Sequence, residues 1–420
     1  MDNRRGAPNI FSMNIDTDIA IVGGGLGGTT LALALARSGH TVTLIEPKTE
    51  TLRKNAGFDG RSYAIAQASH RMLRTIGLWD ELADQAQPML EIKVTDGRAG
   101  EGPSPFFLHF DHAEIEEGPM GFMVEDRHLR RVLLDAIKRE TNVQSITGRA
   151  VAAQDVSPGC VTLKLDDGAV LTTKLVVGAD GRGSGTGKRA GIGRTEWGYD
   201  QTALVCALDH EKPHGGIAHQ FFMPPGPLAI LPLTGNRSSI VWSETTMDAA
   251  RIHDLTDVDY LDHLRPRFGS FLGDIKLAGK RYTYPLGLSL ANSFIAPRVA
   301  LVADAAHGVH PIAGQGLNAG LRDVAALTEV LTDAKRRGED IGSETVLGAY
   351  QQWRRFDTAT LAMATDGFNR LFSNDNPFLR AARDIGMGAL QAMPKLRRGF
   401  IREAAGLTGD LPKLMQGRAP

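Results

Sequence analysis

Asp304, His307 and His310 follow one another at intervals of three residues, a spacing that could place three metal ligands on one face of a helix. Gly308 and the step before Pro311 argue against a regular helix through all three. No set of carboxylates and histidines elsewhere in the chain completes a recognisable group of ligands. We therefore predict no metal site from this spacing.

The segment GGGLGG at 23–28 has the residue types of a phosphate-binding turn. Gly23, Gly25 and Gly28 match the pattern G-x-G-x-x-G. Glycines at these places permit a tight turn and let a pyrophosphate approach the N-terminus of a helix, whose free N–H groups and dipole favour anions. The motif alone indicates a dinucleotide-binding turn.

The elements around this motif are those that such a turn requires. An apolar strand pattern at 18–22 precedes it, and a helical pattern follows and ends at Gly39. A second strand pattern ends at Glu46, 23 residues after Gly23, where a carboxylate can accept hydrogen bonds from an adenosine ribose. We predict an adenine dinucleotide site, and the pattern leaves FAD and NAD open.

The sequence matches neither the P-loop motif for phosphate binding nor the nucleophile-elbow motif for catalysis. The stretch GSGTGKRA at 183–190 resembles a P-loop, but Arg182 stands where a glycine is needed and Arg189 where a hydroxyl is needed. No nucleophile-elbow pattern G-x-S-x-G occurs. The chain is therefore not expected to be a P-loop nucleotidase or an α/β-hydrolase.

The rest of the chain alternates between strand and helix patterns. Helical patterns cover 61–82 and 125–140, the second with apolar residues at Leu129, Val132, Leu133 and Ile137. A hairpin is predicted at 161–175 with its turn at Asp167-Gly168, followed by a buried parallel-type strand ending at 178. Short strands dominate 199–244, another parallel-type strand lies at 298–304, and the chain is mostly helical from Leu317. These patterns indicate a discontinuous dinucleotide-binding domain and a second domain that contains an antiparallel sheet.

Composition limits the class of protein. The chain has 420 residues, is 42% hydrophobic and 23% charged, and carries a formal net charge of −1, which gives no overall attraction to nucleic acid or to an anionic membrane. Cys160 and Cys206 are the only cysteines and suggest a reducing compartment. The uncharged stretch at 19–36 holds five glycines, which disfavour a membrane helix. We expect a cytoplasmic protein with a flexible tail at 1–16 and no signal peptide.

Three motifs in order resemble one enzyme family. GGGLGG with Glu46, GADG at 178–181 and RVALVADAAHGVHPIAGQGLNAG at 298–320 resemble the FAD-dependent aromatic hydroxylases, single-component flavoprotein monooxygenases with the para-hydroxybenzoate hydroxylase fold. DGRSYAIA, FMVEDRHLRRVLLDAI and HPIAGQGLNAGLRDVAAL resemble its ubiquinone-biosynthesis branch. The similarity runs over almost the whole chain, to AAGLTGDLPKLMQG at 404–417.

The resemblance makes the expected architecture specific. It implies an α/β fold with α+β elements, in which a discontinuous Rossmann-like FAD-binding domain carries an inserted antiparallel-sheet substrate domain and a helical C-terminal region. The FAD-binding domain is expected to comprise 17–80, 112–195 and 290–335. The substrate domain is expected to comprise 81–111 and 196–289, and the helical region 336–420.

The family pattern also implies which residues bind FAD. The pyrophosphate is expected at Gly23, Gly25, Leu26, Gly27 and Gly28, and the adenosine ribose at Glu46. Arg61 matches an arginine that closes over the cofactor, with assistance from Arg127 or its neighbours Arg130 and Arg131, and Asp304 matches the aspartate at the ribityl chain. The isoalloxazine ring is expected against a loop formed by Pro311, Gly314, Gln315, Gly316, Leu317 and Asn318.

Two departures from the family pattern affect these assignments. The usual Gly-Asp before the ribityl contact is Ala303-Asp304 in this chain. Asp180 belongs to the Asp-Gly motif that serves both FAD and the nicotinamide donor, but the customary Val-Arg after it is Thr186-Gly187. Candidates to replace that arginine are the nearby cations Arg182, Lys188 and Arg189.

The resemblance implies a redox reaction rather than acid–base catalysis by side chains. NADH or NADPH reduces FAD, O₂ adds at flavin C4a, and the resulting hydroperoxide transfers oxygen to the ring of a prenylated phenol. Related chemistries stay open: epoxidation of an isoprenoid, double-bond reduction, or a non-catalytic FAD-binding subunit of a quinone-synthesis complex. A helix beginning near Leu317 would direct its N-terminus at negative charge on reduced flavin.

Two apolar regions are candidates for contact with a lipophilic substrate. The stretch FFMPPGPLAILPL at 221–233 is a candidate pocket wall, with Phe222, Leu231 and Pro232 as substrate contacts, although packing of a sheet core would use the same residues. Residues 374–420 carry eight Lys or Arg against four Asp or Glu and read as basic amphipathic helices. These helices either pack on the FAD-binding domain or touch the inner face of an anionic membrane.

Overall fold

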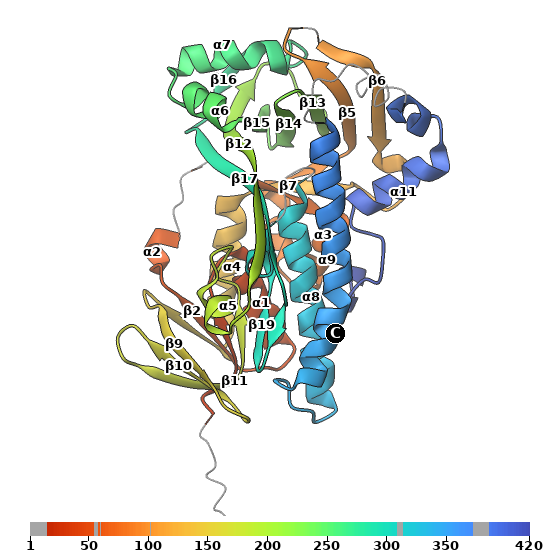
Figure 1. Cartoon of the computed structure of the whole chain (residues 1–420). Coiled ribbons are helices and arrows are strands. Elements are labelled where there is room, and N and C mark those ends of the chain that lie inside the picture. The colour runs from red at the N-terminus through yellow and green to blue at the C-terminus, as the bar shows by residue number, and fades with distance from the viewer. Residues whose placement is uncertain (1–14, 54–57, 59, 101, 309–313, 373–385) are drawn as a thin grey trace, which may run out of the picture.

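The computed structural model describes residues 15–53, 58, 60–100, 102–308, 314–372 and 386–420 (Figure 1). A mainly parallel sheet lies in the lower half of that view, and a large, mainly antiparallel sheet, in which β13 and β5 pair parallel, lies in the upper half. The long helices α8 (Gln315–Arg336) and α9 (Glu344–Phe372) run along one side, and α9 reaches from the lower half into the upper one.

The lower sheet has the strand order β18-β19-β11-β1-β2-β8, with the hairpin strands β10 and β9 attached to β11. Its central strand β1 has Ile19, Ala20 and Ile21 fully buried, as expected for a parallel strand covered on both faces. The strands are β1 (Thr17–Val22), β2 (Val42–Glu46), β8 (Val143–Thr147), β9 (Val151–Val156), β10 (Val161–Leu165), β11 (Val170–Gly178), β18 (Ile295–Ala296) and β19 (Val299–Leu301).

The predicted elements of this half are confirmed. Helix α1 (Leu26–Arg37) joins β1 to β2, and Gly39 ends it with a φ of +86°. Strand β10 pairs antiparallel with β11, whereas β11 pairs parallel with β1 and β19. Helix α4 (Asp126–Arg139) buries the four apolar residues that its periodicity singled out.

The upper sheet has the order β20-β17-β12-β15-β14-β13-β5-β6, with β16 beside β12. The strands predicted within 199–244 are confirmed. Helices α6 (Thr246–His253) and α7 (Asp257–Phe268) share an apolar cluster with this sheet, which includes Trp242 and Tyr260. The strands are β5 (Glu91–Arg98), β6 (Gly102–Asp111), β12 (Arg194–His210), β13 (Ile217–Met223), β14 (Gly226–Leu233), β15 (Arg237–Thr245), β16 (Ile275–Leu277), β17 (Tyr282–Ala291) and β20 (His307–Gly308).

A small third sheet corrects one prediction. The helical pattern at 61–82 was expected to be helical throughout, but its first part is the strand β3 (Ser62–Ala66) and only α3 (Gln67–Thr75) is α-helical. Strand β3 pairs with β7 (Gly121–Glu125), which also pairs with β4 (Ala86–Met89). Pairing with a strand distant in the sequence overrode the local helical periodicity.

Shorter helices complete the described chain. Helix α11 (Pro394–Ala404) contacts β6, and α8 packs against both α1 and α9. The division into domains predicted from the sequence stays a prediction. The remaining short helices are α2 (Glu50–Arg53), α5 (Gly185–Arg189), η1 (Trp79–Glu81), η2 (Ala83–Gln85), η3 (His112–Glu114), η4 (Ala303–Ala305) and η6 (Lys413–Gln416).

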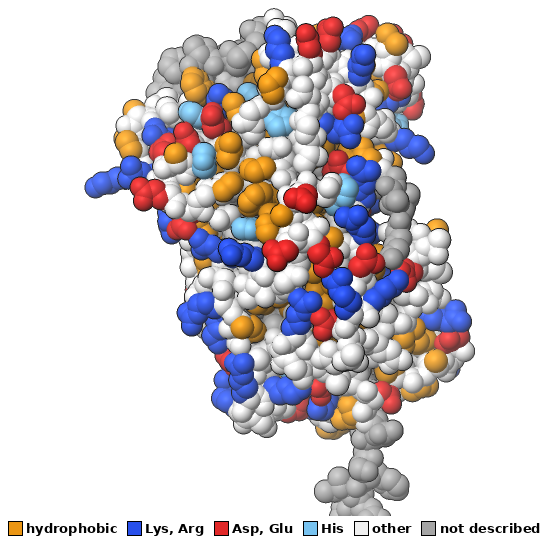
Figure 2. All heavy atoms as spheres, turned by 180° about the vertical axis from the view of Figure 1, so that it is seen from behind, with side chains coloured by type: hydrophobic (Ala, Val, Ile, Leu, Met, Phe, Trp, Pro, Cys, Tyr) orange, Lys and Arg blue, Asp and Glu red, His pale blue; other side chains and the backbone are white. Residues whose placement is uncertain are grey.

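Surface charge is mixed rather than segregated. On the face shown in Figure 2, Lys and Arg side chains alternate with Asp and Glu side chains, while hydrophobic side chains gather in the upper half of the view. Within the described residues, no helix is long and apolar enough to cross a bilayer.

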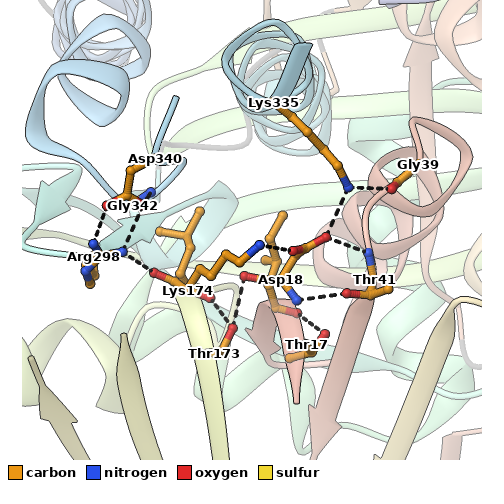
Figure 3. A network of polar contacts seen from close by, with 12 residues as sticks. Thr17, Asp18, Gly39, Thr41, Thr173, Lys174, Arg298, Lys335, Asp340 and Gly342 are labelled. Atoms are coloured by element: carbon orange, nitrogen blue, oxygen red, sulfur yellow. Dashed lines mark hydrogen bonds and ion pairs between the residues drawn. The ribbon is translucent and has the colours of Figure 1, made fainter. Parts of the chain in front are cut away.

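Asp18 ties the lower sheet to α8 at the edge opposite the glycine turn (Figure 3). Its carboxylate accepts hydrogen bonds from Lys174 Nζ at 2.7 Å, Lys335 Nζ at 3.1 Å and the N–H of Thr41 at 3.2 Å. Burial alone would raise the pKa of Asp18, but these three donors hold that pKa well below its ordinary value. The edge of the sheet is therefore fixed by charge-assisted contacts.

His40 lies fully buried in the same region. Neither of its ring nitrogens has a hydrogen-bond partner among the described residues. Burial, reinforced by the positive charges of Lys335 and Lys174, lowers the pKa of His40 from 6.5 to about 4. The folded protein therefore keeps this ring neutral at a pH where the unfolded chain protonates it.

This difference predicts a pH-dependent loss of stability. The contribution of His40 is fully present above pH 6.5 and falls as the pH drops toward 4, because only the unfolded chain gains a proton in that window. We expect about 2 kcal/mol of the unfolding free energy to be lost from this residue between pH 7.5 and pH 5. Urea titrations should show a flatter pH dependence for His40→Gln than for the natural protein. Parallel pH profiles of the two proteins would contradict the assignment.

Candidate functional site

The glycine turn between β1 and α1 closes tightly and leaves one side open. A Cβ atom at Gly28 would lie 1.9 Å from the carbonyl oxygen of Gly23, and one at Gly23 would lie 2.4 Å from that of Ala179. Gly23 also has a φ of +106°, which strongly favours glycine. A Cβ at Gly25 would meet nothing within 4 Å. The backbone at Gly25 is therefore accessible to a ligand.

The N-terminus of α1 suits an anion. Its first residue follows Gly25, which provides no side-chain cap, and the first turn holds no acidic residue. The first N–H groups of the helix therefore have no side-chain acceptor, and a pyrophosphate would supply one.

Glu46 stands at the end of β2 beside this turn. Its carboxylate accepts hydrogen bonds from the N–H of Gly24 at 2.7 Å and of Lys48 at 2.9 Å. A carboxylate has about four acceptor positions, so two hydrogen bonds leave room for the hydroxyl groups of a ribose. The arrangement fits the role expected of Glu46.

Arg53 is a site residue that the sequence motifs did not reveal. Its Nη2 donates to the carbonyl oxygen of Gly24 and to Thr29 Oγ1, the latter at 3.2 Å. Its Nε is buried and has no hydrogen-bond partner among the described residues. Burial lowers the pKa of Arg53. The positive charge of Arg53, next to the glycine turn, is thus only partly compensated by negative charge. A bound pyrophosphate would supply the missing negative charge. A single arginine in α2 matches no motif, so no sequence signal indicates this role.

The second glycine-rich segment meets the first through Ala303. A Cβ at Gly27 would lie 3.1 Å from Ala303 Cβ, and one at Gly320 would lie 2.8 Å from it. Ala303 has a φ of +53°, a conformation in which glycine is usual. Its methyl group occupies the space that Gly27 and Gly320 leave free. Ala303, which replaces the glycine of the family pattern, thus fits between Gly27 and Gly320, and Asp304 after it is exposed.

Asp323 on α8 holds this segment from inside. Its Oδ2 accepts hydrogen bonds from the N–H of Ala303 at 2.9 Å and from His307 Nε2 at 2.6 Å, and its Oδ1 accepts one from Arg354 Nε at 2.8 Å. Burial alone would raise the pKa of Asp323, but His307 and Arg354 outweigh it and lower that pKa. The side chains of Asp323, His307 and Arg354 are at most 2% exposed.

His307 is therefore part of a buried polar network with Asp323 and Arg354. Asp304 is exposed nearby, and His310 lies outside the described residues. Within the described part of the chain, no cluster of His, Cys, Asp or Glu could hold a metal ion.

The turn at 314–318 begins α8 and contacts β3. Gly314 has a φ of +64°, and the side chain of Asn318 accepts from the N–H of Ala66 at 2.9 Å and donates to the carbonyl oxygens of Ala64 at 2.8 Å and Gly314 at 3.2 Å. Asn318 therefore positions the turn through β3. A Cβ at Gly316 would meet nothing within 4 Å, so the backbone is accessible there.

The other members of the predicted ring loop have different surroundings. Gln315 donates from Nε2 to the carbonyl oxygen of Ala404 at 3.4 Å, and Leu317 packs against the main apolar core. Pro311 lies outside the described residues. The N-terminus of α8 has neither a side-chain cap nor an acidic residue in its first turn, so its N–H groups could face a negatively charged ring.

The predicted arginines lie together at the start of α4. Arg61 Nη2 is 3.4 Å from Asp126 Oδ2, and Arg127 Nε donates to Glu125 Oε2 at 2.6 Å. Arg130, the alternative to Arg127, forms a two-pronged pair with Asp126. Arg61 and Arg127 thus lie at the junction of β3 and α4, each against a different carboxylate, and Arg130 mainly holds Asp126.

Asp180 is used by the loop that follows it. Its carboxylate accepts hydrogen bonds from Ser184 Oγ at 2.5 Å, and from the N–H and Oγ1 of Thr186 at 2.9 and 3.0 Å. The Asp-Gly motif thus fixes the entry to α5. Thr186 stands where the family pattern has valine, and its hydroxyl group helps to hold Asp180.

The predicted substrate residues divide between the two faces of the upper sheet. Phe222 on β13 pairs with Pro227 on β14, so it shares a face with Leu231, whereas Pro232 points to the opposite face. Leu231 packs with Met123 and Ala64, next to the turn at 314–318. Phe222 packs against Met387.

Gln220 adds a polar group to the same face of the sheet. It lies two residues before Phe222 and pairs with Ala229. Its Nε2 is buried and has no hydrogen-bond partner among the described residues. This face therefore combines apolar side chains with a free hydrogen-bond donor, as a pocket for an oxygen-bearing ring would require.

Taken together, these residues fit an FAD molecule in an extended conformation. The open backbone at Gly25, the carboxylate of Glu46 and the incompletely paired Arg53 match an adenosine diphosphate group. Asp304 and the accessible turn at Gly316 continue the site toward the upper sheet. This order of groups agrees with the one that the family resemblance implies for FAD.

Comparison with known proteins agrees with this geometry. The profile of the FAD binding domain family matches residues 16–364. The chain is 45% identical over 403 residues to the ubiquinone hydroxylase UbiL of Rhodospirillum rubrum, covering 95% of this chain and 92% of that protein. It is 34% identical to the 3-demethoxyubiquinol 3-hydroxylase of Escherichia coli, covering 94% of this chain and all of that protein, 100%.

Solved structures show the same fold. The p-nitrophenol 4-monooxygenase PnpA of Pseudomonas putida superposes with a TM-score of 0.75 at 20% identity, covering 94% of this chain and 98% of that one. PqsL of Pseudomonas aeruginosa gives 0.74 at 24% identity, covering 88% and 99%. Mixed α/β architecture of this type is therefore the fold of the chain.

The Asp323 network yields a test of how the site is held. Asp323→Asn would remove the buried charge that Arg354 Nε and His307 Nε2 contact and leave Arg354 with Asp357 as its carboxylate partner. Removing one member of a buried ion pair typically destabilises a protein by about 3 kcal/mol. Because Asp323 also fixes the N–H of Ala303, the variant should bind FAD more weakly. Thermal melting and FAD fluorescence titration would measure both effects. Asp333→Asn on the outer side of α8 is the matched control, and an equal loss in both variants would refute the role of Asp323.

Proposed function

This chain is a member of the FAD-dependent aromatic hydroxylase family, and on that premise we propose that it hydroxylates the ring of a prenylated phenol in ubiquinone biosynthesis. Identity to a ubiquinone hydroxylase over nearly the full length of both chains is the observation that carries the proposal. NADH or NADPH and O₂ are the proposed co-substrates. The ring carbon is left open, because the name of the 45% identical relative gives no ring position, whereas that of the 34% identical relative does.

The side chains of the site bind and orient rather than transfer protons. FAD, once bound, supplies the electron transfer and oxygen activation that amino acids lack. Glu46 and Arg53 anchor its adenosine end, and Asn318 fixes the turn at 314–318 against β3. The N-terminus of α8 offers N–H groups and a favourable dipole to negative charge on the ring.

The upper sheet excludes water from the reacting ring. Leu231, with Ala64 and Met123, forms an apolar surface beside the turn at 314–318. Gln220 Nε2, free on the same face, could donate a hydrogen bond to an oxygen of the substrate. Such a surface would receive an aromatic ring with an apolar tail and would exclude water from it.

The test of the proposed function is isotopic. Purified protein loaded with FAD, given NADH or NADPH and oxygen-18 gas, should convert a prenylphenol into a product that contains one oxygen-18 atom. A product without the isotope would refute hydroxylation by O₂, and a product gaining only hydrogen would indicate a reductase. Bound FAD without any substrate-stimulated oxidation of the nicotinamide would indicate an accessory subunit.

Helix α11 supports a further part of the proposal, contact with a membrane surface. Its outer side exposes Leu396 and Phe400, at 54% and 44%, near Met393 at 50%. Lys395 and Arg398 lie exposed on the same helix. Its inner side is tied down by Arg397, which pairs with Glu114, and by the fully buried Ile401.

An apolar row flanked by exposed cations is the pattern of a helix that lies in an anionic bilayer surface. A prenylated substrate is dissolved in that bilayer, so such a contact would shorten its path to the site. Participation in a quinone-synthesis complex stays a prediction, as does a location in the cytoplasm at the inner face of the membrane.

Vesicle flotation tests this contact. Leu396→Ser combined with Phe400→Ser should lower binding to vesicles of phosphatidylserine and phosphatidylcholine by about tenfold, because two partly exposed apolar side chains would no longer enter the bilayer. Met247→Ser, which changes an 80% exposed methionine on α6, is the control. Equal binding by the natural protein and the double variant would rule out α11 as the contact.

A further inference from the structure

The aromatic ring of Phe58, three residues before Arg61, lies beside two arginine side chains from different halves of the molecule. Its centroid is 5.5 Å from Cζ of Arg127 at the start of α4 and 5.5 Å from Cζ of Arg237 at the start of β15. Both distances are within the range of a cation–π interaction, which extends to about 6 Å. The ring therefore attracts one cation beside the cofactor site and one cation of the upper sheet.

A carboxylate orients each of these two guanidinium groups. Arg127 Nε donates to Glu125 Oε2 at 2.6 Å, and Arg237 Nε donates to Asp209 Oδ1 at 2.7 Å. The hydrogen bond to Asp209 raises the pKa of Arg237 above its ordinary value. A guanidinium group that pairs with a carboxylate through its edge can still present its face to an aromatic ring. Both contacts of Phe58 are therefore made by cations whose positions are already fixed.

The ring of Phe58 also packs on the upper sheet. Like Ala64 and Leu231, it lies against an apolar cluster that includes Leu233 of β14. A Cβ atom at Gly279 would lie 3.5 Å from Cδ1 of the ring, so the ring rests against the backbone between β16 and β17. Apolar packing and two cation–π contacts thus hold the same side chain to the upper sheet.

Gly60 continues this contact up to Arg61. A Cβ atom at Gly60 would lie 3.4 Å from Tyr282 Cδ2 and 3.5 Å from the carbonyl oxygen of Lys280. The carbonyl oxygen of Arg61 itself accepts a hydrogen bond from the N–H of Asp126 at 3.0 Å. The start of α4 therefore holds one side of the Arg61 backbone, and the upper sheet holds the chain that precedes it.

We propose that Phe58 is a positioning residue that keeps Arg61 over the flavin cofactor by anchoring the preceding chain to the upper sheet. The inference rests on the part of the proposed function in which Arg61 contacts FAD, and it does not depend on the substrate. Phe58 acts through Arg61 rather than by its own contact with the cofactor. Retention of FAD thereby depends on the contact between the two halves of the molecule.

The rate of FAD release tests the proposal without turnover. The holoenzyme is diluted, and the change in flavin fluorescence reports the release. Phe58→Leu keeps an apolar side chain but removes the aromatic face, so it should release FAD about tenfold faster, a change of the size expected for the loss of two cation–π contacts. Phe58→Tyr keeps that face and should release FAD at the natural rate. Equal acceleration in the two variants would overturn the proposal.

Arg237 gives an independent readout, because it lies on β15 and has no assigned role at the cofactor. Arg237→Gln should also accelerate FAD release, and its combination with Phe58→Leu should add little, since both changes break the same contact. Fully additive effects would contradict an action of Arg237 through Phe58. Phe271→Leu, which changes an exposed aromatic residue stacked on Phe268, is the matched control and should leave the release rate unchanged.

The background of Arg61→Gln separates positioning from a general structural role. Arg61→Gln should itself accelerate FAD release, and Phe58→Leu should have no further effect in that background, because the group that Phe58 positions is then absent. Thermal melting of the FAD-free proteins should give Phe58→Leu no larger loss of Tm than Phe271→Leu. An undiminished effect of Phe58→Leu in the Arg61→Gln background would refute the inference.

The outcomes also distinguish this inference from the proposed function. Hydroxylation by a protein whose FAD release is unchanged in Phe58→Leu would refute the inference alone. Release rates that follow the expected pattern, in a protein that hydroxylates no prenylphenol, would refute the proposed reaction alone. Unchanged FAD release in Arg61→Gln would refute the role of Arg61 and the inference with it.

Discussion

The carboxylate of Asp323 is the interaction on which the arrangement of the site depends. It is fully buried on α8, and it joins the turn that carries Asp304, the strand β20 and the helix α9 through the N–H of Ala303, His307 and Arg354. A buried carboxylate is costly unless its acceptor positions are filled, so these three donors must converge on it when the chain folds. The same convergence fixes where the second half of the cofactor site lies relative to the parallel sheet.

The contact of Ala303 with two glycines sets the distance between the halves of that site. Gly27 at the start of α1 and Gly320 on α8 leave a space that only a methyl group fills. Any larger residue at either glycine would push the turn at Asp304 away from the N-terminus of α1. The N-termini of α1 and α8 both lack a side-chain cap among the described residues, so under the proposed function each would offer N–H groups to a different part of one elongated ligand.

Because the cofactor supplies the redox chemistry, the polar residues of the chain serve to position its own loops, strands and side chains. Asp180 holds its own loop, Asn318 holds β3, and Arg130 holds Asp126. A group that stays unpaired within the described residues is therefore informative, as is Gln220 Nε2 on the face of the sheet next to the flavin turn.

The sequence by itself determined the elements whose geometry is local. The glycine pattern at 23–28, the strand ending in Glu46 and the apolar periodicity of α4 each require only residues within one turn or one strand, and all were predictable. The family resemblance added the flavin and the reaction. Tertiary structure decided what local patterns leave open. Pairing with β7 made 62–66 a strand. Packing also brought the side chain of Asn318 into hydrogen-bond contact with the backbone of β3, more than 250 residues away in the sequence. It also placed Arg53 at the glycine turn. A side chain of a given type has many possible partners along the chain, and only the packing of distant elements brings one of them within reach.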